Sequence, residues 1–506
     1  MGATTPAANV LTDRLLRSWL RCRRRAWLDR HGDPAERRWT AHRNLQLDDQ
    51  QRCFVALLPQ RPGRGRAACS AGAEGVVGLR LKGEGPDGDR LEAHPPLLRR
   101  VKGHSRWGAF AYQPVLARQG RRLTREHQLP LALIAHLLEQ EQQAPVPDML
   151  VVGGGGRRLE RDRVGFSAGL RRQLSDSLKK LSADLGRESP PPLAADRRKC
   201  TLCSWRGSCN AVAVAEGHLS EVSGIGAKRR DMLQQLGIDG MQDLASADPE
   251  RLAERMNRFG EQHGEAAYAL VAQASAQRDG RTDRLDRSAA LPELADAPGV
   301  LLYDIESDPD ARHDFLHGFL CLPRQSNGCW DLASAKYHPL LALAEHGEQR
   351  SWLRLQRLLK RYGQWPVLHY GETETLALRR LAQRQGASDR ELQALKTRLI
   401  DVHARIRRHW RLPLSSYGLK AVAAWRGFHW SQPGVDGARA LLWWRQWQGR
   451  GFARRGSTHA LRWIFRYNRD DCLATWAVAD WLLSADATSA VDGVSSGEDL
   501  PHRSVD

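Results

Sequence analysis

The sequence predicts a multidomain α/β protein, and three observations support this fold class. The chain has 506 residues, of which 41% are hydrophobic, enough for about two to four packed domains. Residues 290–485 alternate apolar strand patterns with amphipathic helical patterns. Residues 216–285 show short helical patterns joined by glycine turns, and residues 1–215 mix helical patterns with glycine-rich segments. We expect these three folded parts to be followed by a disordered tail over residues 486–506, which are rich in Ser, Asp and Gly.

The net charge of the chain is strongly positive. The formal charge is +19 at pH 7, and the isoelectric point is near 10.0. Such an excess favours a polyanion as partner, most often nucleic acid, and the alternative is a basic surface with no specific partner. No apolar run of about 18 residues predicts a membrane span. The N-terminus lacks the charge pattern of a secretory signal, so we expect a cytoplasmic protein without membrane contacts.

Four cysteines of the first part have a spacing that suits a metal or cluster. Cys200, Cys203 and Cys209 lie in "KCTLCSWRGSC", and a tetrahedral centre needs a fourth ligand. No further Cys or His follows closely, and the candidate lies far upstream, at Cys22. The alternative is a set of unligated thiols, and a long chain without a secretory signal argues against disulfides.

One early cysteine followed by a late Cys-x2-Cys-x5-Cys resembles the iron–sulfur clasp of RecB-like nucleases. The resemblance implies a restriction-endonuclease-like α/β fold with a [4Fe–4S] cluster, and zinc is the alternative ion. In that family two acids and a lysine form the catalytic centre, followed by a glutamine on a helix. Here Pro96, Leu116, Arg118 and Pro130 stand at those positions. The resemblance therefore implies a basic scaffold without catalysis, unless the nearby acids Asp87 and Glu92 replace the missing ones.

The second part contains a candidate nucleic-acid-binding turn. In "VSGIGAKRRDML" a Gly-Ile-Gly turn, Gly224 to Gly226, precedes a basic helical pattern. This resembles a helix-hairpin-helix element, in which backbone N–H groups and a helix N-terminus hold a phosphate independently of sequence. The cationic residues of this pattern are Lys228, Arg229 and Arg230. The alternative is a pair of interdomain helices joined by a glycine turn.

The third part begins with an apolar strand that carries two acids, in "LLYDIESD". Alternate residues of a strand point the same way, so Asp304 and Glu306 project side by side. Two like charges at that distance raise the cost of ionising each other. We therefore expect a positive group between them.

Further acids of the third part follow a second strand and lie on a late helix. Glu374 falls in the first turn of a helix after the predicted strand 366–369, and Tyr467 and Asp471 share a helix face. Four converging carboxylates suit two Mg²⁺ or Mn²⁺ ions, which together can activate water and stabilise the leaving oxygen of a phosphodiester. Asp470 is the competing ligand beside Asp471, and Asp401 is expected to cap the helix that follows it.

This constellation, over residues 298–485, resembles the DEDD exonuclease superfamily of RNase H-like fold, and more closely its YprB-type branch. The resemblance implies that Asp304, Glu306, Glu374 and Asp471 bind metal and that Tyr467 positions the attacking water. The wider superfamily usually has Asp where Glu374 stands. The segment "LSSYGLKAVAAWRGF" also looks like the YprB-type branch.

The sequence thus predicts a metal-dependent nuclease, specifically a 3′→5′ exonuclease on single-stranded ends. The polarity comes from the resemblance alone, and DNA and RNA both stay open as substrates. The alternative is a catalytically inactive scaffold that binds nucleic acid, beside helicases or other repair proteins. The five intact catalytic residues argue against this alternative, and the degenerate first domain argues for it.

Overall fold

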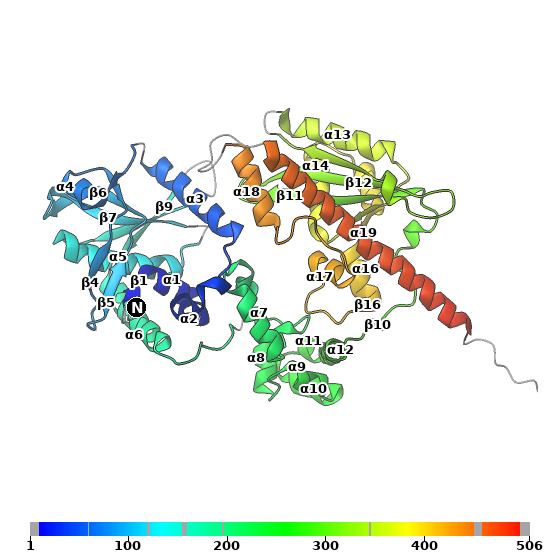
Figure 1. Cartoon of the computed structure of the whole chain (residues 1–506), viewed down its shortest axis with the longest axis horizontal. Helices are drawn as coiled ribbons and strands as arrows, with labels where there is room; N and C mark the ends of the chain where they lie inside the picture. The colour runs from blue at the N-terminus through cyan, green and yellow to red at the C-terminus, as the bar shows by residue number, and fades with distance from the viewer. Residues whose placement is uncertain are drawn as a thin grey trace, which may run out of the picture. The chain divides into compact units, whose positions relative to one another are not determined.

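The fold is that of a computed structural model, which describes residues 10–58, 60–118, 122–153, 159–194, 197–343, 346–449 and 458–495. The chain divides into two compact units, residues 1–212 and 213–506, which we call the N-terminal and C-terminal units (Figure 1). None of the described helices is long and apolar enough to cross a membrane.

The N-terminal unit is built on a six-stranded sheet of order β2-β3-β6-β7-β8-β9 and a three-stranded sheet of order β1-β5-β4. Its strands are β1 (Leu11–Thr12), β2 (Gly63–Arg64), β3 (Gly75–Val77), β4 (Leu81–Glu84), β5 (Arg90–Ala93), β6 (Leu97–Ser105), β7 (Gly108–Arg118), β8 (Asp148–Gly153) and β9 (Glu160–Gly165). Its helices are α1 (Asp13–Arg21), α2 (Arg23–His31), α3 (Ala41–Leu57), α4 (Gly65–Ser70), α5 (Arg125–Gln142) and α6 (Ala168–Leu185), with α7 (Arg206–Ala215) at its end. Short 3₁₀ turns span Pro34–Glu36 and Arg197–Leu202.

The core of this unit forms around α5. The run "LPLALIAHLL" in α5 is apolar on nearly every side, and all its residues except His136 are buried in the unit. A helix that is hydrophobic all round needs cover on all sides. Here α1, α6 and the sheet strands provide that cover.

The C-terminal unit begins with a helical part that has its own apolar cluster. Leu219, Leu233, Leu244 and Leu270 belong to this cluster. Its helices are α8 (Ala227–Gln235), α9 (Met241–Ala245), α10 (Pro249–Met256), α11 (Glu261–Gly264) and α12 (Ala267–Arg278), with 3₁₀ turns at Leu219–Glu221 and Asn257–Phe259. The Gln273 amide donates to the carbonyl of Leu412 at 2.9 Å, so α12 is tied to the part that follows.

The rest of the C-terminal unit is a five-stranded sheet of order β13-β12-β11-β14-β15. Its strands are β11 (Gly299–Asp308), β12 (His313–Pro323), β13 (Lys336–Leu341), β14 (Val367–His369) and β15 (Leu399–Asp401), with β10 (Asp283–Arg284) and β16 (Trp410–Arg411) forming a separate pair. Strand β11 pairs antiparallel with β12 and parallel with β14. The helices are α13 (Gly347–Arg361), α14 (Glu372–Arg384), α15 (Asp389–Arg398), α16 (Val402–His409), α17 (Leu419–Trp425), α18 (Gly437–Trp447) and α19 (Thr458–Ser495), with 3₁₀ turns at Pro292–Leu294 and Leu332–Ser334.

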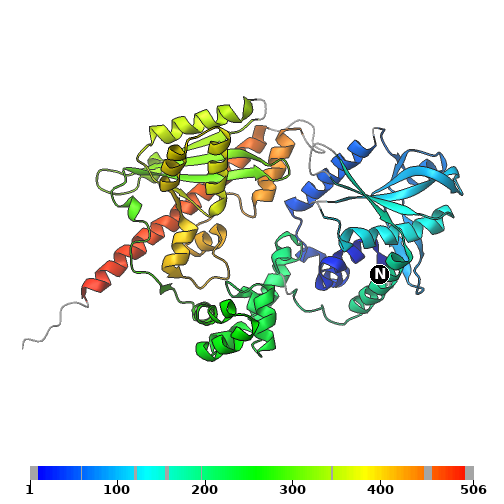
Figure 2. The ribbon, with the colours of Figure 1, turned by 180° about the vertical axis from the view of Figure 1, so that it is seen from behind.

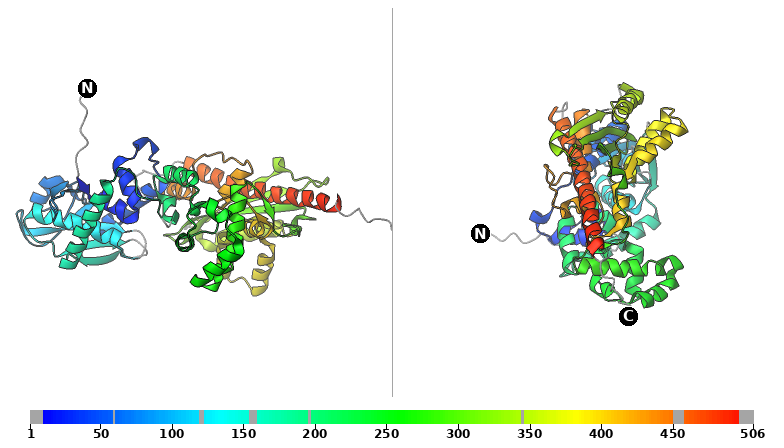
Figure 3. Two further views of the ribbon diagram at one scale, coloured as in Figure 1. Left: turned by 90° about the horizontal axis from the view of Figure 1, so that it is seen from below. Right: turned by 90° about the vertical axis from the view of Figure 1, so that its right-hand side faces the viewer.

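The alternation of side chains between the two faces of β11 determines which helix its acids face. Leu301 and Tyr303 join the apolar cluster that contains residues of α13, α14 and α15. Val300 and Leu302 join the cluster that contains residues of α16, α17 and α19, on the other face of the sheet. The two groups of helices are seen from opposite sides in Figures 1 and 2 and edge-on in Figure 3 (right). Asp304 and Glu306 continue the face of Leu302, so they point toward α19.

Helix α19 extends further than the sequence predicted. It runs to Ser495, past residue 485, where we expected the disordered tail to begin. The Asp486 carboxylate accepts a hydrogen bond from the backbone N–H of Ala290 at 2.7 Å and pairs with Arg284 at 2.6 Å. These contacts hold a turn of helix that is polar by composition, so residue 486 does not begin a tail. The remainder of the predicted tail, residues 496–506, lies outside the described residues.

Candidate metal centre

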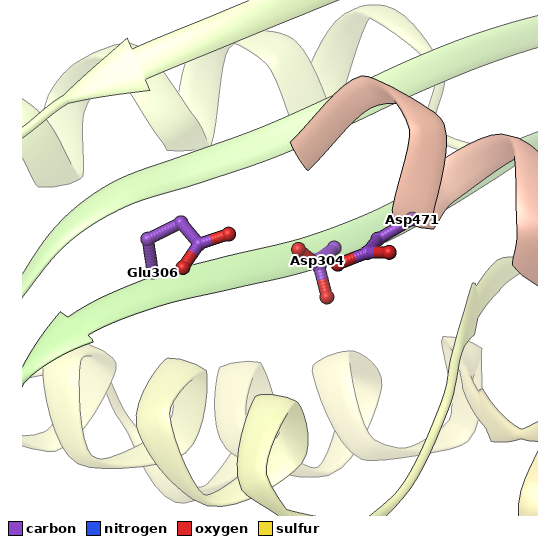
Figure 4. Close-up of side chains that lie close together, drawn as sticks. All are labelled: Asp304, Glu306 and Asp471. Atoms are coloured by element: carbon purple, nitrogen blue, oxygen red, sulfur yellow. The ribbon is translucent and has the colours of Figure 1, made fainter. Parts of the chain in front are cut away.

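Three of the four predicted carboxylates meet at one point of the C-terminal unit. Asp304, Glu306 and Asp471 each offer an oxygen atom, and these atoms all lie within 4.8 Å of one another. Figure 4 shows the two acids projecting from β11 and Asp471 reaching them from α19. Glu306 and Asp471 are 6% and 7% exposed, so water cannot fully screen the three charges.

The pKa values of these acids reflect their crowding. Burial raises the pKa of Asp304 well above its usual range, and the charges of Asp471 and Glu306 raise it further. Burial followed by the charge of Asp471 does the same for Glu306. The pKa of Asp471 is also raised by burial, although Trp430, Lys420 and Tyr467 oppose the shift. Carboxylates that repel one another inside a protein form a hard oxygen site, and a divalent cation would relieve the repulsion.

Glu374 lies near Asp304, Glu306 and Asp471 but is not part of the group whose oxygen atoms all lie within 4.8 Å of one another. It lies in the first turn of α14, directly after β14, and is 8% exposed. Burial raises its pKa to about 7, and the charges of Asp401 and Asp471 contribute to the rise. Its Oε2 atom is buried without a hydrogen-bond partner in the described part of the chain. An orphaned buried carboxylate oxygen beside three other acids fits a cation ligand.

The neighbouring acids have other partners, as their positions in the sequence suggested. Asp401 accepts hydrogen bonds from the backbone N–H groups of Gly371 and His403, both at 2.9 Å, which confirms that it caps α16. Asp470 accepts from the N–H and the hydroxyl of Ser431 at 2.9 and 2.5 Å. Asp471, not Asp470, therefore faces the acids of β11.

Tyr467 lies one helical turn before Asp471 and is almost fully buried. A hydrogen bond between the two side chains lowers the pKa of Asp471. The ammonium of Lys420 lies 4.9 Å from the centre of the Tyr467 ring and donates to the carbonyl of Val435 at 2.5 Å. Its positive charge also lowers the pKa values of Glu306 and Asp471.

Sequence reasoning missed two residues that position the carboxylates. The amide of Asn468 donates to Asp304 Oδ2 at 2.6 Å, and its oxygen accepts from the Tyr337 hydroxyl at 2.8 Å. The indole N–H of Trp430 donates to Asp471 Oδ1 at 2.6 Å. Asn468 lies three residues before Asp471 on the same helix face, a signal that could have identified it. Trp430 comes from a loop, and no local pattern marks it.

Gly318 makes room for this arrangement. It pairs with Asp304 across the β11–β12 ladder. A Cβ atom at position 318 would lie 1.6 Å from Asn468 Oδ1 and 2.9 Å from the Tyr337 hydroxyl. Since neither atom can approach a carbon that closely, the absence of a side chain at 318 allows Asn468 to reach Asp304.

The predicted cysteine ligands come from the two ends of the N-terminal unit. Cys22 separates α1 from α2, Cys200 lies in the 3₁₀ turn Arg197–Leu202, Cys203 follows that turn, and Cys209 lies in the first half of α7. Burial raises the pKa values of Cys200 and Cys209, and the charge of Cys22 adds to both shifts. The fold thus brings Cys22 near the late cysteines. No three of these four sulfur atoms, however, all lie within 4.8 Å of one another in the described part of the chain.

A tryptophan attaches the cysteine loop to α2. Trp205 is 1% exposed, and its indole N–H donates to Asp29 Oδ1 at 2.8 Å. The backbone N–H of Arg38 donates to the carbonyl of Ser204 at 3.0 Å. These contacts hold the late cysteines against the segment that carries Cys22.

The degenerate positions of the N-terminal unit hold no metal ligands. Pro96 precedes β6, Leu116 and Arg118 are buried on β7, and Pro130 lies inside α5. Arg118 pairs with Glu160 at 2.5 Å and with Asp162 at 3.0 Å. The alternative acids also form ion pairs. Asp87 lies 3.0 Å from the Lys179 ammonium, and Glu92 lies 2.6 Å from the Arg80 guanidinium.

The Gly-Ile-Gly turn precedes α8 as the sequence indicated. Gly224 has φ +91°, a value that glycine adopts without strain, and Gly226 is the N-cap of α8. Lys228 is exposed. The Arg229 guanidinium donates back to the carbonyl of Gly224 at 2.8 Å, while Arg230 is only 11% exposed and pairs with Asp231. Lys228 is therefore the most accessible of the three cations.

Comparison with known proteins identifies the fold of one part of the C-terminal unit. Residues 301–483 match the family model of the RNase H superfamily. These residues form an RNase H-like domain, and this class of domain is that of metal-dependent nucleases acting on nucleic acid. A solved structure titled "Crystal structure of SSO0001" is 11% identical over 41% of this chain and 89% of its own, with a TM-score of 0.26. No curated protein matches the chain.

Proposed function

We propose that the RNase H-like domain, residues 290–485, is a 3′→5′ exonuclease acting on single-stranded ends of nucleic acid. The convergence of Asp304, Glu306 and Asp471 within 4.8 Å carries the proposal. Three crowded acids, of which Glu306 and Asp471 are buried, repel one another and would be stabilised by bound cations. Their similarity to the DEDD pattern, and to the YprB-type branch in particular, supports the choice of reaction and polarity.

The donor set fits Mg²⁺ or Mn²⁺, because every oxygen comes from a carboxylate. Asp304, Glu306, Asp471 and Glu374 would hold two ions. Bound ions supply an activated water and stabilise the charge on the leaving oxygen. The chain itself contributes the positions of the groups: Asn468 and Trp430 orient Asp304 and Asp471 by hydrogen bonds.

Tyr467 and Lys420 have the positions of groups that act beside the ions. The Tyr467 hydroxyl is adjacent to Asp471, where it can hold the attacking water by a hydrogen bond. Burial and the neighbouring acids raise the pKa of Tyr467, so the hydroxyl keeps its proton and acts as a donor. Lys420 places a positive charge beside the acids, toward which the scissile phosphate is drawn.

The N-terminal unit, in this proposal, is a nucleic-acid-binding scaffold with an iron–sulfur clasp. Zinc would bring its sulfur ligands to about 3.8 Å from one another, given Zn–S bonds of about 2.3 Å in a tetrahedron. The order of one early cysteine and a late Cys-x2-Cys-x5-Cys, which resembles the iron–sulfur clasp of RecB-like nucleases, supports a [4Fe–4S] cluster over zinc. The ion pairs of Arg118 with Glu160 and Asp162 support a structural role for the former catalytic positions.

The Gly224–Gly226 turn would add a sequence-independent phosphate contact, with Lys228 as its main cation. Contacts of this kind weaken with salt, which suits a protein that meets many sequences. If the carboxylate site does not catalyse cleavage, the alternative function is that of an inactive scaffold, which would bind nucleic acid through this turn and the basic N-terminal unit.

The nuclease proposal is tested with the full chain purified anaerobically. Labelled single-stranded DNA and RNA are incubated with Mg²⁺, Mn²⁺ or EDTA, beside Asp304→Asn and the matched surface control Asp389→Asn. We expect metal-dependent shortening from the 3′ end by the wild type and the control, and none by Asp304→Asn. Circular single strands and strands blocked at the 3′ end should stay intact. Shortening by Asp304→Asn at the wild-type rate would refute the proposed site.

The clasp has its own test. Iron and acid-labile sulfide are measured in the wild type, in Cys200→Ser and in Cys329→Ser, which alters an exposed cysteine of the other unit. We expect iron in the wild type and the control but not in Cys200→Ser. Zinc in place of iron under anaerobic purification would contradict the cluster and keep the metal site.

A further inference from the structure

One face of α1, in the N-terminal unit, is made of arginines. Arg14, Arg17 and Arg21 are separated by three and four residues, so their side chains project from the same side of the helix. Like charges at this spacing repel one another. Arg21 has an acidic partner, because it lies 2.8 Å from Glu126 of α5. No acid of the described residues pairs with Arg14 or Arg17, so the face carries positive charge that the fold does not balance.

Arg17 is the least satisfied member of this face. Its side chain is half-buried, and its Nε atom is buried without a hydrogen-bond partner in the described part of the chain. Burial, and after it the charges of Arg21 and Arg43, lower the pKa of Arg17 to about 10, although Glu126 and Asp13 oppose the shift. A buried cation without a partner costs free energy in the folded state. A bound anion would remove this cost.

Arg43 brings a second helix, α3, to the same group. It is exposed and donates to the amide oxygen of Gln46 at 3.4 Å, which is a long hydrogen bond to a neutral group. No acid pairs with it in the described ranges of the chain. Partial burial lowers the pKa of Arg43, and the charges of four further arginines add to the shift: Arg14, Arg25, Arg21 and Arg37. The guanidinium groups of α1 and α3 are therefore close enough to repel one another.

The nearby acids are already engaged. Asp29 lies 3.7 Å from Arg25 and 3.6 Å from Arg37. Its two oxygens also accept hydrogen bonds from the Ser18 hydroxyl at 2.6 Å and from the Trp205 indole at 2.8 Å. An acid with this many donors cannot turn to the arginines that lack a partner. The missing negative charge must come from outside this group.

His127 at the start of α5 shows how positive the surroundings are. Burial lowers its pKa to about 4, and the charges of Arg17, Arg21 and Arg118 contribute to the shift. The imidazole is therefore neutral at pH 7. Arg118 stands at one of the degenerate positions, so the arginine group borders the part of the unit in which those positions hold no metal ligands.

We propose that Arg14 and Arg17 of α1 and Arg43 of α3 form a binding site for a phosphate group. A guanidinium is planar and donates two parallel hydrogen bonds to phosphate oxygens. A phosphate monoester carries about −1.5 to −2 charges at neutral pH and offers three strong acceptor oxygens, so a single group can serve several arginines. A carboxylate has one charge and two oxygens, which a single arginine already satisfies.

The phosphate can be free in solution or part of a nucleic-acid strand. The proposal deepens the scaffold role proposed for the N-terminal unit and rests on that role only for the source of the phosphate. In a nucleic-acid-binding scaffold the site would hold the strand by its backbone or its end and would read no base. The two sources are separated by the choice of ligand in the test.

The test uses the full chain, purified anaerobically and freed of divalent ions. Amide hydrogen exchange is followed in peptides of α1 and α3 with chloride, pyrophosphate, citrate or a 5′-phosphorylated oligonucleotide at equal ionic strength. The site variants are Arg17→Met and Arg43→Met, and position 43 is exposed, so that its substitution does not disturb packing. The matched control is Arg357→Met, which alters an exposed arginine of α13 in the other unit.

Pyrophosphate at about ten times its Kd should slow exchange in α1 and α3 roughly tenfold in the wild type and the control, because only the folded state binds it. Both site variants should lose most of this protection, and citrate should protect the wild type far less. In chloride, Arg17→Met should exchange no faster than the wild type, because it removes an unpaired cation. Protection by the oligonucleotide assigns the phosphate to nucleic acid, and protection by pyrophosphate alone assigns it to a free phosphate compound.

The proposal is overturned if no phosphate compound protects these peptides, if both site variants are protected like the wild type, or if citrate protects as well as pyrophosphate. Faster exchange of Arg17→Met in chloride would also overturn it, since Arg17 would then stabilise the fold by itself. The scaffold role is judged separately. An oligonucleotide that protects only the Gly224–Gly226 turn keeps the scaffold and refutes this site, whereas protection by pyrophosphate without any oligonucleotide binding keeps the site and refutes the scaffold.

Discussion

Glu374→Gln should stabilise the metal-free C-terminal unit at neutral pH, although it removes a proposed metal ligand. The carboxylate is 8% exposed, one of its oxygens has no hydrogen-bond partner among the described residues, and three other acids lie near it. Ionising such a group costs free energy that the folded state must bear. An amide of the same shape carries no charge and avoids this cost.

The magnitude follows from the pKa. Burial and neighbouring acids raise the pKa of Glu374 from 4.5 to about 7, which corresponds to about 3 kcal/mol at 1.36 kcal/mol per tenfold change in proton affinity. Because the pKa is raised on folding, the folded state is favoured below pH 4.5 and loses this stability as pH rises through 7. Wild-type stability should therefore fall by about 3 kcal/mol from this group between pH 4.5 and pH 8.

The assay follows urea unfolding of the full chain in EDTA by hydrogen exchange, read from peptides of β11 and α19, at pH 5 and pH 8. Relative to the wild type, Glu374→Gln should gain about 2–3 kcal/mol more at pH 8 than at pH 5. Excess Mg²⁺ should stabilise the wild type by mass action and the variant less. An equal effect of the substitution at both pH values would refute the reasoning that Glu374 is ionised at a cost.

Two further substitutions test the residues that hold the site together. Arg445 is 2% exposed and donates hydrogen bonds to Asp308 at 2.7 and 3.0 Å. Arg445→Met should lower the free energy of unfolding in urea by about 3–5 kcal/mol, because it leaves the Asp308 charge buried without a partner. Adding Asp308→Asn should restore most of this lost free energy. Failure of the double variant to recover would show that packing, not charge, dominates. Trp430→Phe removes the 2.6 Å hydrogen bond to Asp471 and should weaken Mn²⁺ binding by titration calorimetry roughly 10- to 100-fold, while thermal stability changes little. Unchanged Mn²⁺ affinity would remove Trp430 from the site.

The sequence predicted the parts of the site that local periodicity controls. The period-two pattern of β11 places Asp304 and Glu306 on one face, and the helical period places Tyr467 beside Asp471. The position of Glu374 followed from the order of strand and helix, because a strand that enters a parallel sheet delivers the next helix N-terminus to the same edge. The match of residues 301–483 to the RNase H superfamily is in keeping with this order of elements.

Contacts between distant segments could not be predicted in the same way. Arg445 meets Asp308 from 137 residues away, and Trp430 meets Asp471 across 41 residues. Neither pair has a spacing that a helix or a strand would repeat. The predicted start of the tail at residue 486 was wrong for a related reason. The composition around Asp486 is polar, yet α19 continues to Ser495, and Asp486 contacts Ala290 and Arg284, which are distant in sequence.

These distant contacts explain how a cluster of repelling acids can persist in a folded domain. Asp304, Glu306 and Asp471 repel one another between β11 and α19, and the charge of Lys420 opposes this repulsion for Glu306 and Asp471. Arg445 fixes the end of β11, Trp430 and Asn468 attach the two aspartates by hydrogen bonds, and Asp486 fixes the far end of α19. Because this stability comes from residues beyond the acids, the domain can keep the acids crowded and ready for cations. The crowding that makes the site costly to fold is therefore the feature that a bound divalent cation would relieve.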